Sequence, residues 1–93
     1  MDATHTAEIL KSLADETRLI LVRRLVDEGC EVASRELIGG CSEALQLSQP
    51  TLSHHFSKLV QSRVLLPRKS GTKKYYRLNV DLLSSIGIDP TKL

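Results

Sequence analysis

The sequence predicts one small, mainly α-helical domain of about five helices with a β-hairpin near its C-terminal end. Apolar residues recur at helical spacing between residues 5 and 28 and again between 49 and 62. A basic segment with alternating side chains, interrupted by Ser-Gly, follows at 65–78. Ninety-three residues is the length of one domain, so we expect residues 1–93 to fold as a unit.

The first part of the chain predicts two helices. The segment HTAEILKSLADETRLILVRRLVDEG places apolar residues three and four positions apart, which is the spacing of one helix face. Asp15 is a favoured N-cap and Gly29 is a favoured residue just after a helix, so a helix is predicted over 16–28. A shorter helix is predicted before it, over about 5–13.

The next segment, EVASRELIGGCSEALQL, carries a weaker helical pattern. Ser34 can cap a short turn through RELI, and Ser42 can cap a second turn through EALQ. Gly39 and Gly40 stand between them and lower the local helix propensity. We therefore expect two short helical turns here, separated by the glycines.

The strongest local signal begins at SQPTLSHHFSKLVQ. Ser48 is a favoured N-cap, and Pro50 falls in the first helical turn, where a missing N–H costs nothing. Apolar residues then repeat at helical spacing, which predicts a helix over 49–62. The following run, VLLPRKSGTKKYYRLN, predicts a two-stranded hairpin with its tip at 70–72, and VDLLSSIGI predicts a short final helix.

Charge is distributed unevenly, although the formal net charge is only +2. Residues 44–80 contain no acid, and this excess of basic charge indicates an anionic partner, with nucleic acid as the first candidate. The basic residues of this block are Lys58, Arg63, Arg68, Lys69, Lys73, Lys74 and Arg77.

Other features narrow the class of protein. No apolar run is long enough for a membrane span, and the N-terminus lacks the basic region of a secretory signal, so we expect a cytoplasmic protein. There is no Gly-rich phosphate loop and no pair of catalytic carboxylates, and no cysteine lies near a histidine along one element. We therefore expect neither an enzyme nor a bound cofactor.

The predicted order of helices followed by a basic hairpin is that of a winged helix-turn-helix. In this architecture the Ser-capped helix enters the major groove of double-stranded DNA, and the hairpin, or wing, lies along the backbone. The sequence therefore predicts DNA as a partner. A winged-helix module that binds another protein is the alternative, and the acid-free block argues against it unless that protein is acidic.

Helical phase separates the two adjacent histidines. At about 100° per residue, His54 falls nearly opposite the apolar stripe and His55 falls on its flank, so the pair is not expected to chelate a metal. The predicted DNA-contacting residues are Ser48, Gln49, Pro50, Thr51, Ser53, His54, Ser57 and Lys58 on the helix, and Arg68, Lys69, Lys73, Lys74 and Arg77 on the wing. Tyr75 and Tyr76 point to opposite faces of their strand, so one of them should be buried.

Three blocks in order, ILKSLADETRLILVRRL, LQLSQPTLSHHFSKLVQSRVL and RKSGTKKYYRLN, resemble the ArsR/SmtB family of bacterial winged-helix transcriptional repressors. The resemblance covers about residues 7–80. It implies a homodimer, joined by its first and last helices, that binds an inverted-repeat operator and leaves it when a ligand, often a metal ion, binds. The implied dimer residues are Ile9, Leu10, Leu13, Val80, Leu83 and Ile86.

The metal sites of that family have no counterpart in this sequence. Where the resemblance implies a Cys-x-Cys motif, the chain reads Ala33-Ser34-Arg35, and no histidine follows His55 to supply a site on the last helix. We therefore expect no metal site of the family's usual kind. One alternative is a redox-responsive or thiophilic-metal-responsive repressor that uses Cys30 and Cys41; the other interpretation is two small, half-buried residues with no reactive role.

Overall fold

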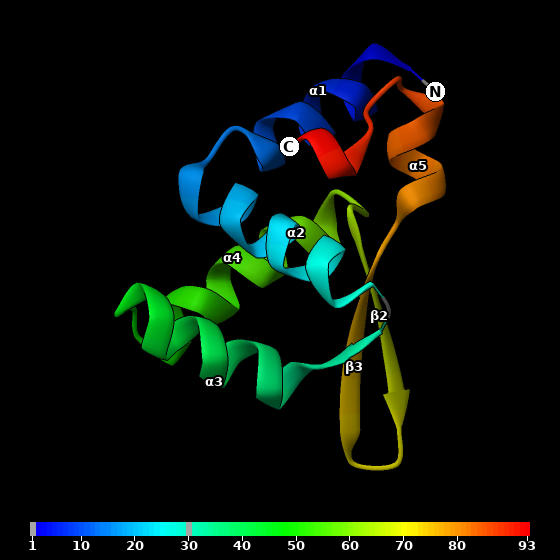
Figure 1. Ribbon diagram of the computed structural model, residues 1–93. Helices are drawn as coiled ribbons and strands as arrows, with labels where there is room; N and C mark the ends of the chain where they lie inside the picture. The colour runs from blue at the N-terminus through cyan, green and yellow to red at the C-terminus, as the bar shows by residue number, and fades with distance from the viewer. Residues whose placement is uncertain (1, 30) are drawn as a thin grey trace.

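The computed structural model describes residues 2–29 and 31–93. Figure 1 shows α1, α5 and the C-terminal turn together at one end of the molecule, while the tip of the β2–β3 hairpin points away from them. The mainly helical fold with a small hairpin is confirmed. The elements are α1 (Ala3–Leu13), α2 (Glu16–Glu28), β1 (Val32–Ala33), α3 (Ser34–Leu45), α4 (Gln49–Gln61), β2 (Leu65–Ser70), β3 (Lys73–Leu78), α5 (Val80–Ser85) and a final 3-10 turn (Pro90–Lys92).

The first two helices begin at aspartate caps. Asp15 accepts a hydrogen bond from the backbone N–H of Arg18 at 2.9 Å, and Gly29 ends α2 with a φ of 71°, a left-handed conformation that glycine adopts without strain. The predicted bounds of α2 are confirmed. Helix α1 begins two residues earlier than predicted, because Asp2 caps it by accepting from the backbone N–H of His5 at 2.8 Å.

Helix α3 is continuous through Gly39 and Gly40, so the predicted break into two turns is wrong. Each glycine costs a helix roughly 1 kcal/mol relative to alanine. Packing offsets this cost, because Leu37 and Cys41, four residues apart on one face, are both buried in the core. The predicted cap Ser42 lies inside the helix instead, and its hydroxyl donates to the carbonyl of Leu47 at 2.6 Å across the following turn.

A tight turn joins α3 to α4. Gln46 takes a left-handed conformation with a φ of 54° and ends α3. Ser48 then caps α4, because its hydroxyl oxygen accepts the backbone N–H of Thr51 at 3.2 Å, and Pro50 occupies the first turn as predicted. Helix α4 therefore starts at the predicted residue and ends one residue before the predicted end.

The hairpin pairs β2 with β3 in antiparallel register, with Ser70 opposite Lys73 across the tip at Gly71 and Thr72. A third strand, β1, pairs with the other edge of β3, so the sheet order is β1-β3-β2. The prediction of two strands is therefore incomplete. Strand β1 has only two residues, too few for alternation to be recognised in a sequence.

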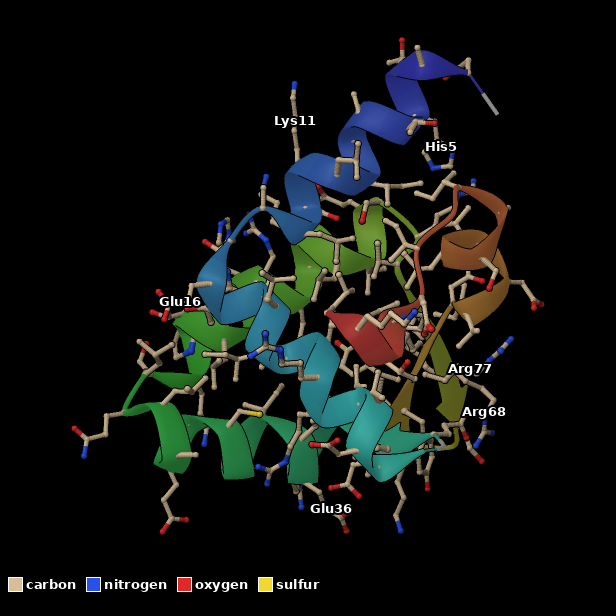
Figure 2. All side chains as sticks on the ribbon, turned by 45° about the horizontal axis from the view of Figure 1, so that its top comes forward. His5, Lys11, Glu16, Glu36, Arg68 and Arg77 are labelled. Carbon is tan, nitrogen blue, oxygen red and sulfur yellow. The ribbon has the colours of Figure 1, made fainter. Side chains whose placement is uncertain are left out.

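Helix α4 and strand β3 meet at the centre of the core. Phe56 of α4 is fully buried and stacks on Tyr76 of β3, with ring centroids 5.2 Å apart and planes 6° apart. Tyr76 is thus the buried tyrosine that strand alternation predicted, while Tyr75 is half-buried. This contact fixes α4 against the base of the hairpin and turns the opposite face of α4 toward solvent. Figure 2 shows how the remaining side chains surround these elements.

Candidate nucleic-acid interface

The outer face of α4 is polar and exposed. Its buried side, formed by Leu52, Phe56 and Leu59, sets the rotation of the helix. The exposure that helical phase predicted for this face is confirmed, whereas contact with DNA remains a prediction. The exposed residues of this face are Ser48, Gln49, Pro50, Thr51, Ser53, His54, Ser57 and Lys58.

The N-terminal turn of α4 divides these side chains into two groups. The hydroxyl of Ser48 donates to the hydroxyl of Thr51 at 2.8 Å, so these two residues are occupied in the cap. Among the described residues, Gln49 and Ser53 have no side-chain hydrogen bond. Their amide and hydroxyl groups can therefore pair with base edges or phosphates without first breaking an internal contact.

The two histidines of α4 have different surroundings. Their rings lie edge to face with centroids 6.0 Å apart, but His54 is exposed and His55 is half-buried. The Nδ1 atom of His55 lies 3.2 Å from an Nη atom of Arg18 and therefore points into the protein. Within residues 2–29 and 31–93 no group of three or more His, Cys, Asp or Glu side chains could hold a metal ion.

Strand register sorts the charges of the wing onto two faces, because side chains of directly opposed residues share a face. Lys69 is opposite Lys74, on the face of buried Tyr76, and the ammonium of Lys74 lies 5.1 Å from the Tyr76 ring centroid. Arg68 lies opposite Tyr75 on the other face, together with Lys73 and Arg77. All five basic side chains of the wing are exposed.

Arg68 already has an anionic partner within the protein. Its guanidinium donates to both carboxylate oxygens of Glu31 at 2.6 to 3.0 Å and lies 4.8 Å from the ring centroid of Tyr75. This guanidinium holds the pKa of Glu31 below its ordinary value. Figure 2 shows Arg68 and Arg77 on the same side of the hairpin. Arg68 therefore links the wing to Glu31, the residue directly before β1. The sequence did not predict this contact.

The predicted dimer residues divide between the core and the surface. Ile9, Leu13 and Leu83 are buried within the single chain and contribute to its core, and their contact with a partner remains a prediction. Leu10 and Val80 are the exposed large hydrophobic residues of the described chain, at 51% and 48% exposure. Ile86 is half-buried. Leu10, Val80 and Ile86 are therefore the residues of the predicted set that keep exposed surface in the single chain.

Cys41 is a buried residue of the core. It is 3% exposed, and burial raises its pKa, against a smaller lowering by the charge of Arg24. A reactive or metal-binding cysteine needs a depressed pKa and access to solvent. Cys41 therefore does not support the redox-responsive or metal-responsive alternative. Its predicted companion, Cys30, lies outside the described residues.

Cys41 is expected to resist alkylation in the folded protein. Iodoacetamide at neutral pH should leave the Cys41 peptide unmodified over the time in which the same peptide is fully labelled in urea, because only the unfolded chain exposes the thiol. Mass spectrometry of the digested protein measures both fractions. Equal labelling rates in the folded and unfolded states would contradict the burial described here.

The fold and the surface together define a class of protein. A short turn joins α3 to a helix with an exposed polar face, and a basic hairpin follows, which is the arrangement of winged helix-turn-helix DNA-binding proteins. Among the described residues, no helix is long and apolar enough to cross a membrane.

Comparison with known proteins gives the family. Residues 15–65 match the model of the arsR family of bacterial regulatory proteins. The arsenical resistance operon repressor of Staphylococcus aureus is 38% identical over 87 residues, which cover 92% of this chain and 77% of that protein. The chain belongs to the ArsR family of transcriptional regulators, as the resemblance in its sequence indicated.

Two solved structures share the fold. HlyU from Vibrio cholerae superposes with a TM-score of 0.69 at 27% identity, over 92% of this chain and 89% of that one. The homodimeric winged helix-turn-helix DNA-binding domain Mb0332 from Mycobacterium bovis gives a TM-score of 0.69 at 23% identity, over 89% and 71% of the two chains. Both confirm the architecture of the helices and wing.

Proposed function

We propose that the protein is a homodimeric repressor that reads an inverted-repeat operator in double-stranded DNA. The observation that carries this proposal is the continuity between the exposed polar face of α4 and the basic wing, in a segment, 44–80, without a single acidic side chain. In this arrangement α4 lies in the major groove and the wing, residues 65–78, lies along the sugar-phosphate backbone. A dimer bound over a promoter would exclude RNA polymerase.

Different side chains have different tasks in this proposal. Gln49, Ser53 and His54 are exposed at the N-terminal half of α4 and carry the donors and acceptors that distinguish base edges in the major groove. The backbone N–H groups at the start of α4 favour a phosphate. The wing lysines add phosphate contacts that raise affinity for every sequence and carry little sequence information.

Dimerisation places two copies of α4 on one face of the DNA. Leu10 of α1 and Val80 of α5 are large hydrophobic side chains left exposed by the single chain. Helices α1 and α5 lie at the same end of the molecule (Figure 1), and in this proposal that end faces the second copy. The Mycobacterium bovis neighbour is described as homodimeric. Two recognition helices related by a two-fold axis would require half-sites about one helical turn apart, roughly 34–36 Å.

Duplex binding measured against salt concentration tests the proposal. We expect the affinity of the purified protein for duplex DNA to fall steeply as salt rises, because phosphate contacts release counterions, and we expect sedimentation equilibrium to give the mass of a dimer. Undetectable or salt-independent binding to duplexes would contradict the proposal. That result would favour the alternative of a winged-helix module that binds another protein.

A further inference from the structure

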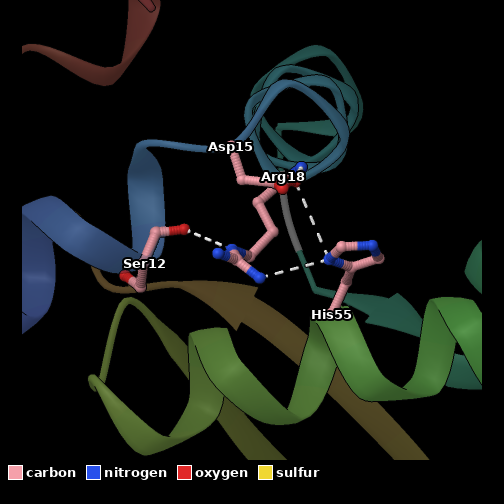
Figure 3. A network of polar contacts seen from close by, with 4 residues as sticks. All are labelled: Ser12, Asp15, Arg18 and His55. Atoms are coloured by element: carbon pink, nitrogen blue, oxygen red, sulfur yellow. Dashed lines mark hydrogen bonds and ion pairs between the residues drawn. The ribbon is translucent and has the colours of Figure 1, made fainter.

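A polar network joins the recognition helix to the junction between α1 and α2. The guanidinium of Arg18, in the first turn of α2, donates from Nε to the backbone carbonyl of Ser12 at 2.6 Å and from Nη1 to Nδ1 of His55 at 3.2 Å. A carboxylate oxygen of Asp15 lies 3.7 Å from the same Nδ1. Figure 3 shows Arg18 between the end of α1 and the middle of α4, with His55 pointing toward it.

The chemistry of Arg18 determines the direction of its hydrogen bond to His55. A guanidinium has only donors, so in a hydrogen bond between these two side chains Nδ1 of His55 is the acceptor. The hydrogen bond therefore depends on one acceptor atom at one position of the side chain. Asp15 accepts the backbone N–H of Arg18 and reaches the same Nδ1 atom with its carboxylate, so an anion and a cation both face this half-buried histidine.

The same guanidinium also satisfies a backbone carbonyl at the C-terminal end of α1. Ser12 is in the last turn of that helix, where backbone carbonyls have no partner within the helix and where a cation is favoured. A second contact links the C-terminal end of α4 to α1. The buried hydroxyl of Ser62, the C-cap of α4, donates to the buried hydroxyl of Ser12 at 2.8 Å. Helices α1 and α4 are thus connected at two points, and Arg18 supplies one of them.

We propose that Arg18 is a positioning residue that, through His55, sets the placement of α4 relative to α1 and so the separation of the two recognition helices in the dimer. The inference rests on the proposed function, since α1 carries the exposed Leu10 of the dimer surface while α4 carries the DNA-reading face. Loss of the Arg18–His55 hydrogen bond leaves each α4 able to read a half-site. It also lets the distance between the two helices vary.

The test is the preference of the dimer for one half-site spacing. Binding is measured to an operator obtained by selection and to versions with one or two base pairs added or removed between the half-sites. His55→Asn and His55→Leu form a matched pair, because the two side chains have nearly the same shape and only asparagine keeps an acceptor near the position of Nδ1. Arg18→Met removes the donor and keeps much of the apolar stem.

We expect the wild type and His55→Asn to bind altered spacings roughly tenfold or more weakly than the natural spacing, given the strength of hydrogen bonds to charged groups. His55→Leu and Arg18→Met should lose most of that discrimination, while their affinity for a single half-site stays unchanged. The double variant should behave like Arg18→Met, because that single change already removes the bond that His55→Leu removes.

A purely structural role of His55 gives the opposite order, since leucine is the better helix former and asparagine the poorer one. Thermal melting identifies the temperature range in which each variant is folded, and binding is compared there. Spacing discrimination that survives in both His55→Leu and Arg18→Met would overturn the inference and leave the proposed function standing. Failure of the wild type to bind any duplex would overturn both.

Discussion

Replacing Lys69, Lys73 and Lys74 together with glutamine should weaken binding to every duplex alike and flatten its dependence on salt. The three ammonium groups are exposed on the wing, and the described residues give none of them an acidic partner. Each phosphate contact contributes about 0.9 to the slope of log affinity against log salt, so the triple change should lower that slope by up to about 2.7 per protomer. Fluorescence anisotropy on specific and random duplexes at several salt concentrations measures both the affinity and this slope.

Arg68→Gln is the matched control on the same hairpin. Arg68 is paired with Glu31 through both carboxylate oxygens, so it contributes less free positive charge than a lysine of the wing. We expect a smaller change of slope for this variant than for a single change at Lys73. If the triple lysine variant keeps the slope of the wild type, the wing does not lie along the DNA backbone.

Phe56→Ala should lower the free energy of unfolding by about 3–5 kcal/mol, the largest effect expected of a single substitution in this chain. The ring is fully buried and stacks on Tyr76, so its removal leaves a cavity where α4 meets the base of the hairpin. Small domains have total stabilities of about 5–15 kcal/mol, so this change removes a large share of the total. Urea unfolding followed by circular dichroism measures the change.

Ser57→Ala is the control for the core substitution. Ser57 is the residue directly after Phe56 and lies on the exposed face of α4. Substitutions at exposed positions of this kind change stability by less than about 0.5 kcal/mol. The contrast between neighbouring positions tests the rotation of α4 directly. A cost below about 1 kcal/mol for Phe56→Ala would show that α4 does not present this residue to the core.

Much of the fold was predictable from local signals. Asp15, Gly29 and Ser48 mark helix ends by hydrogen bonds and conformations that depend only on a few neighbouring residues, and α2 and the start of α4 follow from them. The outward rotation of His54 and the burial of one of the two adjacent tyrosines follow from the periods of helix and strand, although alternation did not indicate which tyrosine it would be. Regular geometry and short-range capping were enough for these features.

The features that were not predicted depend on residues far apart in the sequence. Helix α3 passes through Gly39 and Gly40 because its buried face packs in the core, and tertiary packing overrides helix propensity. Arg68 meets Glu31 across 37 positions, and Arg18 meets His55 across the same separation. No local sequence pattern predicts such a pair.

The predicted dimer surface shows a further limit of sequence patterns. Ile9 and Leu10 are adjacent apolar residues of α1, yet one is fully buried in the core and the other is 51% exposed. An apolar residue at a helical position can pack inside its own chain or against a second one, and periodicity does not distinguish the two cases. Only the packing of α1 on α2 and α4 separates them.

Selection from a library of random duplexes is the most direct test of the claim that α4 reads an operator in a dimer. We expect the purified wild-type protein to enrich an inverted repeat with half-sites about one helical turn apart. We also expect His54→Ala, at an exposed position of α4, to relax the preference at particular base pairs while binding to random duplexes is retained. The account would be contradicted if the wild type enriched no site. It would also be contradicted if His54→Ala and Gln49→Ala both enriched the wild-type site with unchanged base preference.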